Sequence, residues 1–467
     1  MSTTGSIFRD MSRRVVFAVA GVILIACSAP ATPPNVLLYV VDTLRADALE
    51  AYGNAGISTP AFSRLAREGT LFGAAYAAST WTRPSVASLL TGLDPDVHGV
   101  ETRRDHAPES LRLLSESFRE RGYATACITT NPNIASFFGF DQGYDEFEEL
   151  YARRRAGRVH ALEDHAASDE VTRRAIAWID SAPRPFFLFV LSADPHWPYE
   201  PPARFDRYGG SYTGRVNGRH DARRRLDLDE ADRQRIRSLY HAEVTFTDDS
   251  LGRLLDHLDE RDLANSTVVV VTSDHGEEFW EHGQNGHGKE LFEETLRVPL
   301  LVRYPAGVEA GAVVATPVRA VDLAPTLFTL TGSAVPEGID GVSLFETRPG
   351  GAVQEVYASL QLDRARHKAW VEHPWKLVWS PGLRKARLFH LERDPGERHD
   401  LAAEQPQRVA EMKARLHQRA TRNAARRGES GRAAREAAGP VPDEVRGALE
   451  ALGYLDPAAE PERAPEE

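Results

Sequence analysis

Residues 35–42 of this chain read NVLLYVVD, an apolar run that follows one asparagine and ends in an acid. Two further apolar runs occupy residues 185–191 (PFFLFVL) and 267–271 (TVVVV). Short, uninterrupted apolar runs rich in β-branched residues are typical of strands buried on both faces of a parallel sheet. The segment at 227–258 between the last two runs has the pattern of a long helix. Strands that alternate with helices predict an α/β fold with a doubly wound sheet.

An acidic residue comes shortly after each of these strands. Asp42 follows the first strand, Asp194 the second and Asp274 the third. Ligands of doubly wound sheets gather at the carboxyl ends of the strands, which lie along one edge of the sheet. We therefore expect the three acids to lie near one another, around a shared site.

The composition is that of a globular enzyme. A chain of 467 residues is long enough for one large α/β domain and a smaller appendage. The net charge of −12 argues against binding to nucleic acid, which depends on a basic surface that neutralises phosphates. It does not exclude an anionic substrate, because a bound metal ion reverses the local potential.

The N-terminus predicts export. Arg13 and Arg14 precede an apolar run at 15–26 that is too short to span a bilayer and has the proportions of a signal peptide. The run ends in LIAC, which resembles the lipobox of bacterial lipoproteins, where Cys27 would carry lipid. Ser28 then resembles an outer-membrane sorting signal, so we expect a lipid-anchored protein of the cell envelope. The alternative is an ordinary signal peptide with an incidental cysteine.

Residues 82–92 (TRPSVASLLTG) resemble the signature of the sulfatase family, with Pro84, Ser85, Leu89, Thr91 and Gly92 in the family positions. Further segments resemble family motifs in the family's order, at 35–47, 272–277, 321–327 and 340–344. The resemblance implies an alkaline-phosphatase-like fold, with a large mixed, mostly parallel sheet and a small C-terminal antiparallel sheet.

Two positions of the signature depart from the family. Thr82 stands where sulfatases have the Cys or Ser that is oxidised to formylglycine, and Val86 replaces an arginine. Oxidation of a threonine hydroxyl gives a ketone, so formylglycine is not expected. A threonine nucleophile resembles another branch of the superfamily, the phosphoethanolamine transferases, lipoteichoic acid synthases and nucleotide pyrophosphatases.

The resemblance also implies a metal site. Asp42, Asp274 and His275 would bind a divalent ion, Ca²⁺, Mn²⁺ or Zn²⁺, with Thr82 as the fourth ligand and the nucleophile. His196, His287 and Lys289 are the expected catalytic contacts to the ester. Asn131 falls where the family has a lysine. A second metal held by Asp194, His196 and His287 would replace the lost positive charge, and His98 is expected only to shape a turn.

The sequence thus predicts five parts: a signal peptide (1–26), a tether (27–34), a sulfatase-like catalytic domain (35–350), a C-terminal subdomain (351–402) and a helical or disordered tail (403–467) with an amphipathic helix at 445–455. The expected activity is hydrolysis of a sulfuric or phosphoric ester of a small molecule or glycan. Two alternatives stay open. One is a threonine-nucleophile phosphodiesterase or phosphotransferase acting on the cell envelope, and the other is a non-catalytic metal-binding relative.

Overall fold

The computed structural model describes residues 33–151, 167–218, 228–345, 355–428, 434 and 440–455. The predicted signal peptide, Cys27 and nearly all of the tether lie outside these ranges, as does the end of the tail. Within the described ranges, no helix combines the length and the apolar character that a membrane crossing requires.

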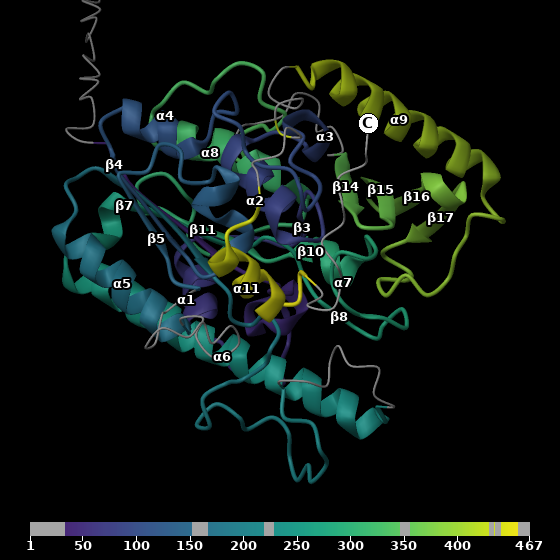
Figure 1. Cartoon of the computed structure of the whole chain (residues 1–467), viewed down its shortest axis with the longest axis horizontal. Helices are drawn as coiled ribbons and strands as arrows, with labels where there is room; N and C mark the ends of the chain where they lie inside the picture. The colour runs from purple at the N-terminus through teal and green to yellow at the C-terminus, as the bar shows by residue number, and fades with distance from the viewer. Residues whose placement is uncertain are drawn as a thin grey trace, which may run out of the picture. The chain divides into compact units, whose positions relative to one another are not determined.

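The central sheet has eight strands in the order β12-β2-β11-β7-β1-β6-β4-β5 (Figure 1). Strand β1 pairs in parallel with both β6 and β7, and β4 pairs in parallel with β5 and β6, whereas β11 runs antiparallel to its two neighbours. The mixed, mostly parallel sheet confirms the predicted fold class. Its strands are β1 (Asn35–Val41), β2 (Thr70–Phe72), β4 (Ala124–Thr129), β5 (Glu146–Glu149), β6 (Phe186–Ser192), β7 (Thr267–Ser273), β11 (Leu300–Arg303) and β12 (Ala312–Val314).

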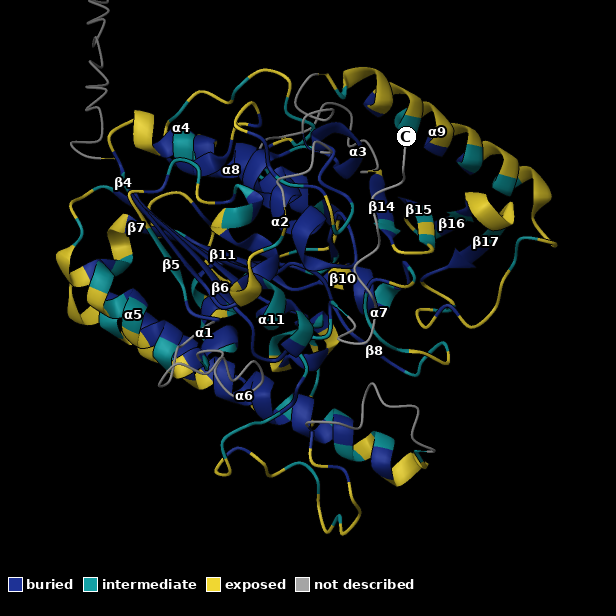
Figure 2. Ribbon diagram, in the orientation of Figure 1, coloured by how far each residue is buried: buried dark blue, intermediate teal, exposed yellow. Residues whose placement is uncertain are grey.

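Helices cover both faces of this sheet, so its central strands are buried throughout (Figure 2). Alternate residues of β1 enter two separate cores: Leu37 and Tyr39 belong to one, Leu38 and Val40 to the other. The first core contains side chains of α1 (Pro60–Glu68), α5 (Ser168–Ser181) and α6 (Glu230–Glu260). The second contains side chains of α2 (Thr82–Thr91), α4 (Leu114–Glu120) and α8 (Leu323–Leu330). Cys127 is buried in this second core.

Smaller elements complete the large domain. They are β3 (Ala75–Tyr76), α3 (Pro95–His98), β8 (Glu278–Phe279), β9 (Asn285–Gly286), α7 (Glu293–Leu296), β10 (Arg297–Val298) and β13 (Val318–Arg319). A Thr-Pro pair such as that at 59–60 predicts a helix capped by the threonine, and this prediction is wrong. The Thr59 side chain does not cap α1, because its hydroxyl accepts from the Glu50 N–H; the Asp248 carboxylate on α6 accepts the N–H groups of Ala61 and Phe62 instead.

The C-terminal part contains the predicted antiparallel sheet. Its four strands are β14 (Val356–Leu362), β15 (Ala365–Glu372), β16 (Trp375–Ser380) and β17 (Lys385–His390), paired in sequence order. Helix α9 (Pro406–Arg426) lies along this sheet (Figure 1), with Met412 and Leu416 packed against Leu377 and Leu388. The sequence predicted a helical or disordered tail from residue 403; α9 is a helix, and one of its faces is buried. The last described helix, α11 (Asp443–Ala451), matches the predicted terminal helix.

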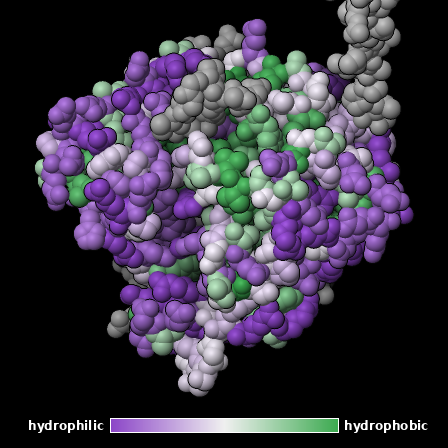
Figure 3. Space-filling view, turned by 180° about the vertical axis from the view of Figure 1, so that it is seen from behind, coloured by the Kyte–Doolittle hydropathy of each residue, from purple (hydrophilic) through white to green (hydrophobic). Residues whose placement is uncertain are grey.

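The surface is largely hydrophilic on the face opposite to the view of Figure 1. Figure 3 shows charged and polar side chains over most of this face, with hydrophobic ones gathered mainly in its upper middle part. This distribution agrees with a chain of which 27% of the residues are charged.

A buried ion network joins the small sheet to the large domain. The Lys376 ammonium on β16 has no exposed side-chain surface and lies 2.9 Å from Glu293 Oε1 and 3.0 Å from Glu397 Oε1. Glu397 Oε2 also accepts the Glu293 N–H, at 2.6 Å. The two carboxylates are therefore held together by one cation from the neighbouring sheet.

We expect Lys376→Met to destabilise the protein by about 3 to 5 kcal/mol, because it leaves two buried carboxylates without their cation. Urea denaturation measures this loss. Lys385→Met is the control, since Lys385 is exposed at the start of β17. Equal midpoints for the two variants would contradict the role assigned to the network.

Candidate active site

Parallel pairing places Asp42 and Asp274 side by side at one edge of the sheet. Val41 of β1 is level with Ser273 of β7, so the next residue of each strand is an aspartate. The Asp274 carboxylate accepts the Thr43 N–H at 3.3 Å and the His275 N–H at 2.8 Å. These backbone bonds fix the Asp274 side chain beside the end of β1.

His275 completes a group of three residues whose ligand atoms lie within 4.8 Å of one another. Its Nε2 lies 3.4 Å from Asp274 Oδ2 and 3.8 Å from Asp42 Oδ1. Its Nδ1 lies 2.9 Å from the Gly276 carbonyl oxygen and donates to it, which leaves Nε2 as the acceptor that faces the carboxylates. A backbone carbonyl that orients a histidine in this way is a usual feature of metal-binding imidazoles.

The electrostatics of this group call for a cation. Burial, and then the neighbouring Asp274, raise the pKa of Asp42 well above its usual value, and burial also raises the pKa of Asp274. Among the described residues, Asp42 Oδ1 and Asp274 Oδ2 are buried without a hydrogen-bond partner. Buried carboxylates of this kind are stable when a cation or a donor satisfies them. The residues present therefore fit a divalent ion, with the predicted ligands Asp42, Asp274 and His275.

The Thr82 hydroxyl lies against this group. Thr82 is the first residue of α2, and its Oγ1 is 3.4 Å from His275 Nε2. The Asn131 amide donates to Thr82 Oγ1 at 3.3 Å and to Asp42 Oδ2 at 2.5 Å. Asn131 thus reaches the position in which the sequence analysis placed it, beside the nucleophile candidate, and contributes a neutral donor.

The arginine next to Thr82 does not replace the cation lost at Val86. The Arg83 guanidinium donates to the carbonyl oxygens of Asn133, Arg103 and Asp105 and lies 3.5 Å from the centroid of the Phe138 ring. Burial lowers its pKa to about 9. Arg83 therefore holds loops together.

Two of the three predicted catalytic contacts join the cluster. The His287 ring centroid is 4.4 Å from that of His275 and 5.1 Å from that of His196. His287 Nδ1 lies 3.1 Å from Glu277 Oε1, a partner that the sequence analysis did not identify. Lys289 is exposed, and its ammonium donates to the Asn285 carbonyl. It lies in a pocket wall outside the buried cluster.

The second metal site suggested by the sequence does not form among the described residues. The Asp194 carboxylate accepts the N–H and the hydroxyl of Ser168, and its ligand atoms do not converge with those of His196 and His287. Asp194 therefore fixes the start of α5, although it lies at the predicted edge.

Two other histidines have structural surroundings. His98 is buried between the Ser88 hydroxyl and the Val100 N–H, and burial lowers its pKa to about 3, so the ring is neutral and shapes the predicted turn. Glu278, His282 and Glu294 form another group of convergent ligand atoms. Both His282 ring nitrogens already have partners there, at Glu294 and at the Glu397 carbonyl.

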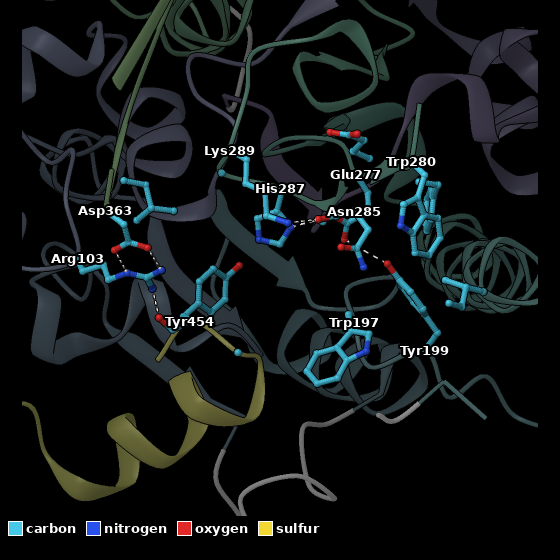
Figure 4. Close-up of a pocket in the computed structure, with 17 residues that line it drawn as sticks. Arg103, Trp197, Tyr199, Glu277, Trp280, Asn285, His287, Lys289, Asp363 and Tyr454 are labelled. Atoms are coloured by element: carbon cyan, nitrogen blue, oxygen red, sulfur yellow. Dashed lines mark hydrogen bonds and ion pairs between the residues drawn. The ribbon is translucent and has the colours of Figure 1, made fainter. Parts of the chain in front are cut away.

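A pocket of about 350 Å³ opens beside the cluster. Figure 4 shows Trp197, Tyr199 and Trp280 along one side and Arg103 with Asp363 on the other, with His287 and Tyr454 between them. The turn between β14 and β15 contributes Leu362 and Asp363, so the small sheet forms part of the wall. Neither Arg103 nor Tyr454 was predicted, because no sequence motif links them to Thr82.

The profile of the sulfatase family matches residues 34–333, and a second profile, N-sulphoglucosamine sulphohydrolase C-terminal, matches residues 281–426. The chain belongs to the sulfatase family. The ulvan-active sulfatase of Formosa agariphila is 26% identical over 340 residues, which span 68% of this chain and 65% of that protein. The match thus covers slightly less than two thirds of this relative.

Two solved structures show the same fold. A protein in complex with its substrate D-glucosamine-2-N,6-O-disulfate superimposes with a TM-score of 0.73 at 22% identity, over 86% of this chain and 99% of the other. The phosphonate monoester hydrolase of Agrobacterium radiobacter superimposes with a TM-score of 0.72 at 21% identity, over 84% and 96%. The predicted family and fold are confirmed, whereas the roles of individual site residues stay predictions.

We expect Asp274→Asn to abolish the stabilisation of the protein by divalent ions. A ligand present at a hundred times its Kd adds about 2.7 kcal/mol to the unfolding free energy. Without metal, the substitution should leave stability equal or raise it, because it removes one of two adjacent buried charges. Urea denaturation with added ion and with chelator measures both effects.

Asp47→Asn is the matched control, because this aspartate comes after the neighbouring strand β1 but is exposed. Its response to the ion should equal that of the parent protein. An undiminished response of Asp274→Asn would contradict the assignment of Asp274 as a ligand.

Proposed function

We propose that this protein is a metal-dependent hydrolase of sulfate esters carried by sugars, with Thr82 as its nucleophile. The proposal rests on one observation above all: the hydroxyl of Thr82 lies against the buried group of Asp42, Asp274 and His275, next to a pocket. The ion is a divalent cation of the Ca²⁺, Mn²⁺ or Zn²⁺ type, for which two carboxylates and one imidazole are suitable ligands.

A bound divalent ion supplies the positive charge that neutralises the substrate's oxygens and favours the ionised form of the Thr82 hydroxyl. The Thr82 oxygen attacks sulfur: the Oγ1–S bond forms while the S–O bond to the sugar breaks. The sugar oxygen takes a proton from His287 or His196, whose rings lie over the cluster. The proton of the Thr82 hydroxyl has by then passed to solvent. Water then attacks sulfur as the Oγ1–S bond breaks; one water proton restores the Thr82 hydroxyl, the other restores the histidine, and sulfate leaves.

The walls of the pocket support a sugar as the carrier of the ester. Trp197, Tyr199 and Trp280 offer aromatic faces, which pack against the apolar faces of sugar rings. Arg103 and Lys289 place cations in the same walls, where a sulfated or carboxylated glycan has its further charges. The ligand of the structural neighbour, a disulfated glucosamine, has these two features.

Phosphate or phosphonate esters are the second candidate. Val86 and Asn131 are neutral where sulfatases have cations that contact the oxygens of the ester. The site then consists of a threonine nucleophile and the metal ligands, as in the superfamily members with a threonine nucleophile, which act on phosphate. The similarity of the fold to a phosphonate monoester hydrolase is compatible with this candidate. Assays on aryl sulfate, phosphate monoester and phosphate diester substrates distinguish the two classes.

We expect Thr82→Val to lower kcat/KM about a thousandfold or more on whichever ester the parent cleaves, because it removes the nucleophilic oxygen and keeps the side-chain shape. Thr91→Val is the control: it removes a hydroxyl at the other end of α2, which donates to the Ala87 carbonyl and accepts the Leu93 N–H. Retention of full activity by Thr82→Val would rule out Thr82 as the nucleophile.

We also propose that the chain is exported and anchored to the outer membrane through lipid on Cys27, which lies outside the described residues. We expect Cys27→Ala to move the protein from the membrane fraction to the soluble fraction and to abolish labelling with radioactive palmitate. Ser28→Ala is the control and should keep the label. An unlabelled parent protein would instead support the ordinary signal peptide.

A further inference from the structure

The candidate nucleophile is closed off from the pocket in this structure. Thr82, Asp42 and His275 have 0% exposed surface and Asp274 has 1%, and none of them lines the pocket. An ester in the pocket is therefore separated from Thr82 by other side chains. Turnover requires that one of these side chains move.

The Tyr454 side chain lies between the pocket and Thr82. Its hydroxyl lies 3.0 Å from Thr82 Oγ1, although 372 residues separate them in the chain. Its ring lies 5.5 Å from that of His196 and 5.7 Å from that of His287, between centroids. Figure 4 shows the ring projecting from the end of the α11 segment toward His287. Tyr454 thus contacts the reacting oxygen on one side and the pocket on the other.

The backbone conformation at the end of α11 determines the direction of the Tyr454 side chain. Gly453 has a φ of +66°, and its N–H donates to the Glu450 carbonyl, while the Tyr454 N–H donates to the Leu449 carbonyl at 2.7 Å. This is the Schellman arrangement, in which a left-handed glycine ends a helix and turns the next residue sharply aside. The residue turned aside here is Tyr454.

Helix α11 docks on the large domain through one apolar face. Its buried side chains Val445, Ala448 and Leu449 join the core that contains Ile134 of the neighbouring 3-10 helix (Pro132–Ile134). The Arg103 guanidinium donates to the Tyr454 carbonyl and pairs with Asp363 at 2.7 Å. The helix itself has nine residues, so its folding depends on this docking.

We propose that residues 443–455, which comprise α11 and the four residues after it, form an autoinhibitory cap. The Tyr454 side chain of this cap competes with the anionic group of the substrate for the space in front of Thr82. In a productive complex the attacked sulfur or phosphorus atom lies about 3 to 3.5 Å from the nucleophilic oxygen. The Tyr454 oxygen already stands at 3.0 Å from it. The cap and the ester therefore exclude each other, and substrate binds after the cap has moved.

The competing interpretation makes Tyr454 a hydrogen-bond donor in catalysis. The hydroxyl is essential to a hydrogen-bond donor but not to a side chain that blocks the site by its ring. A blocking ring still blocks as phenylalanine, whereas a donor is lost in both Tyr454→Phe and Tyr454→Ala. The cap therefore predicts that Tyr454→Phe resembles the parent and that Tyr454→Ala differs from it.

Binding of inorganic phosphate to the metal-loaded, full-length protein tests the cap by calorimetry. If the site is open about a tenth of the time, opening it fully tightens binding about tenfold. We expect this gain for Tyr454→Ala and for Leu449→Ala, which weakens the docking of α11 and leaves Tyr454 intact. Glu444→Gln, on the exposed face of the same helix, should bind as the parent does.

Hydrogen exchange provides the second measurement. Saturating phosphate should speed exchange of the peptide 443–455 in the parent protein, because it displaces the cap. Unchanged affinity in Tyr454→Ala and Leu449→Ala, phosphate binding to none of the variants, or unchanged exchange would each overturn the cap. Equal loss of turnover in Tyr454→Phe and Tyr454→Ala would overturn it in favour of the donor.

The proposal of a cap rests on the proposed function in one respect only, the place where the substrate binds. Different experimental results would refute the cap and the hydrolase. Tighter phosphate binding by the opened variants, with no turnover of any ester, would refute the hydrolase and keep the cap. Turnover by the parent, with the same kcat/KM in Tyr454→Ala, would refute the cap and keep the hydrolase.

Discussion

The repulsion between two buried carboxylates is the constraint on which the site depends. Asp42 and Asp274 are adjacent because β1 and β7 are parallel neighbours in register, and both acids come one residue after the strand ends. A neutral residue at either position would remove the electrostatic repulsion between the two carboxylates. That it places two acids and an imidazole there is the physical argument for a cation.

Much of the large domain follows from local pattern. The apolar runs at β1, β6 and β7 predict buried parallel strands, and the acids behind them predict the site edge, since strand direction alone brings those ends together. Asp194 marks the limit of this reasoning. It lies at the same edge, yet its carboxylate turns to Ser168, because the direction of a side chain depends on its hydrogen-bond partners.

Contacts between distant segments could not be predicted. The Glu277 partner of His287, the carbonyl oxygens around Arg83 and the Tyr454 hydroxyl on Thr82 have no periodicity or spacing that would reveal them. Helix α9 illustrates the same limit. Its composition is mostly polar and charged, yet Met412 and Leu416 pack on the small sheet and Arg419 pairs with Asp94 of the large domain.

The hairpin β14–β15 contributes part of the pocket wall from a second sheet. The end of β14 and the turn after it bring Leu362 and Asp363 into the pocket wall, whereas the proposed metal ligands and Thr82 come from the ends of β1 and β7 and from α2. A Cβ atom on Gly288 would lie 2.6 Å from Leu362, so the two walls meet there without spare room. Substitutions in this turn therefore change the shape of one pocket wall without altering any residue of the buried group of Asp42, Asp274 and His275.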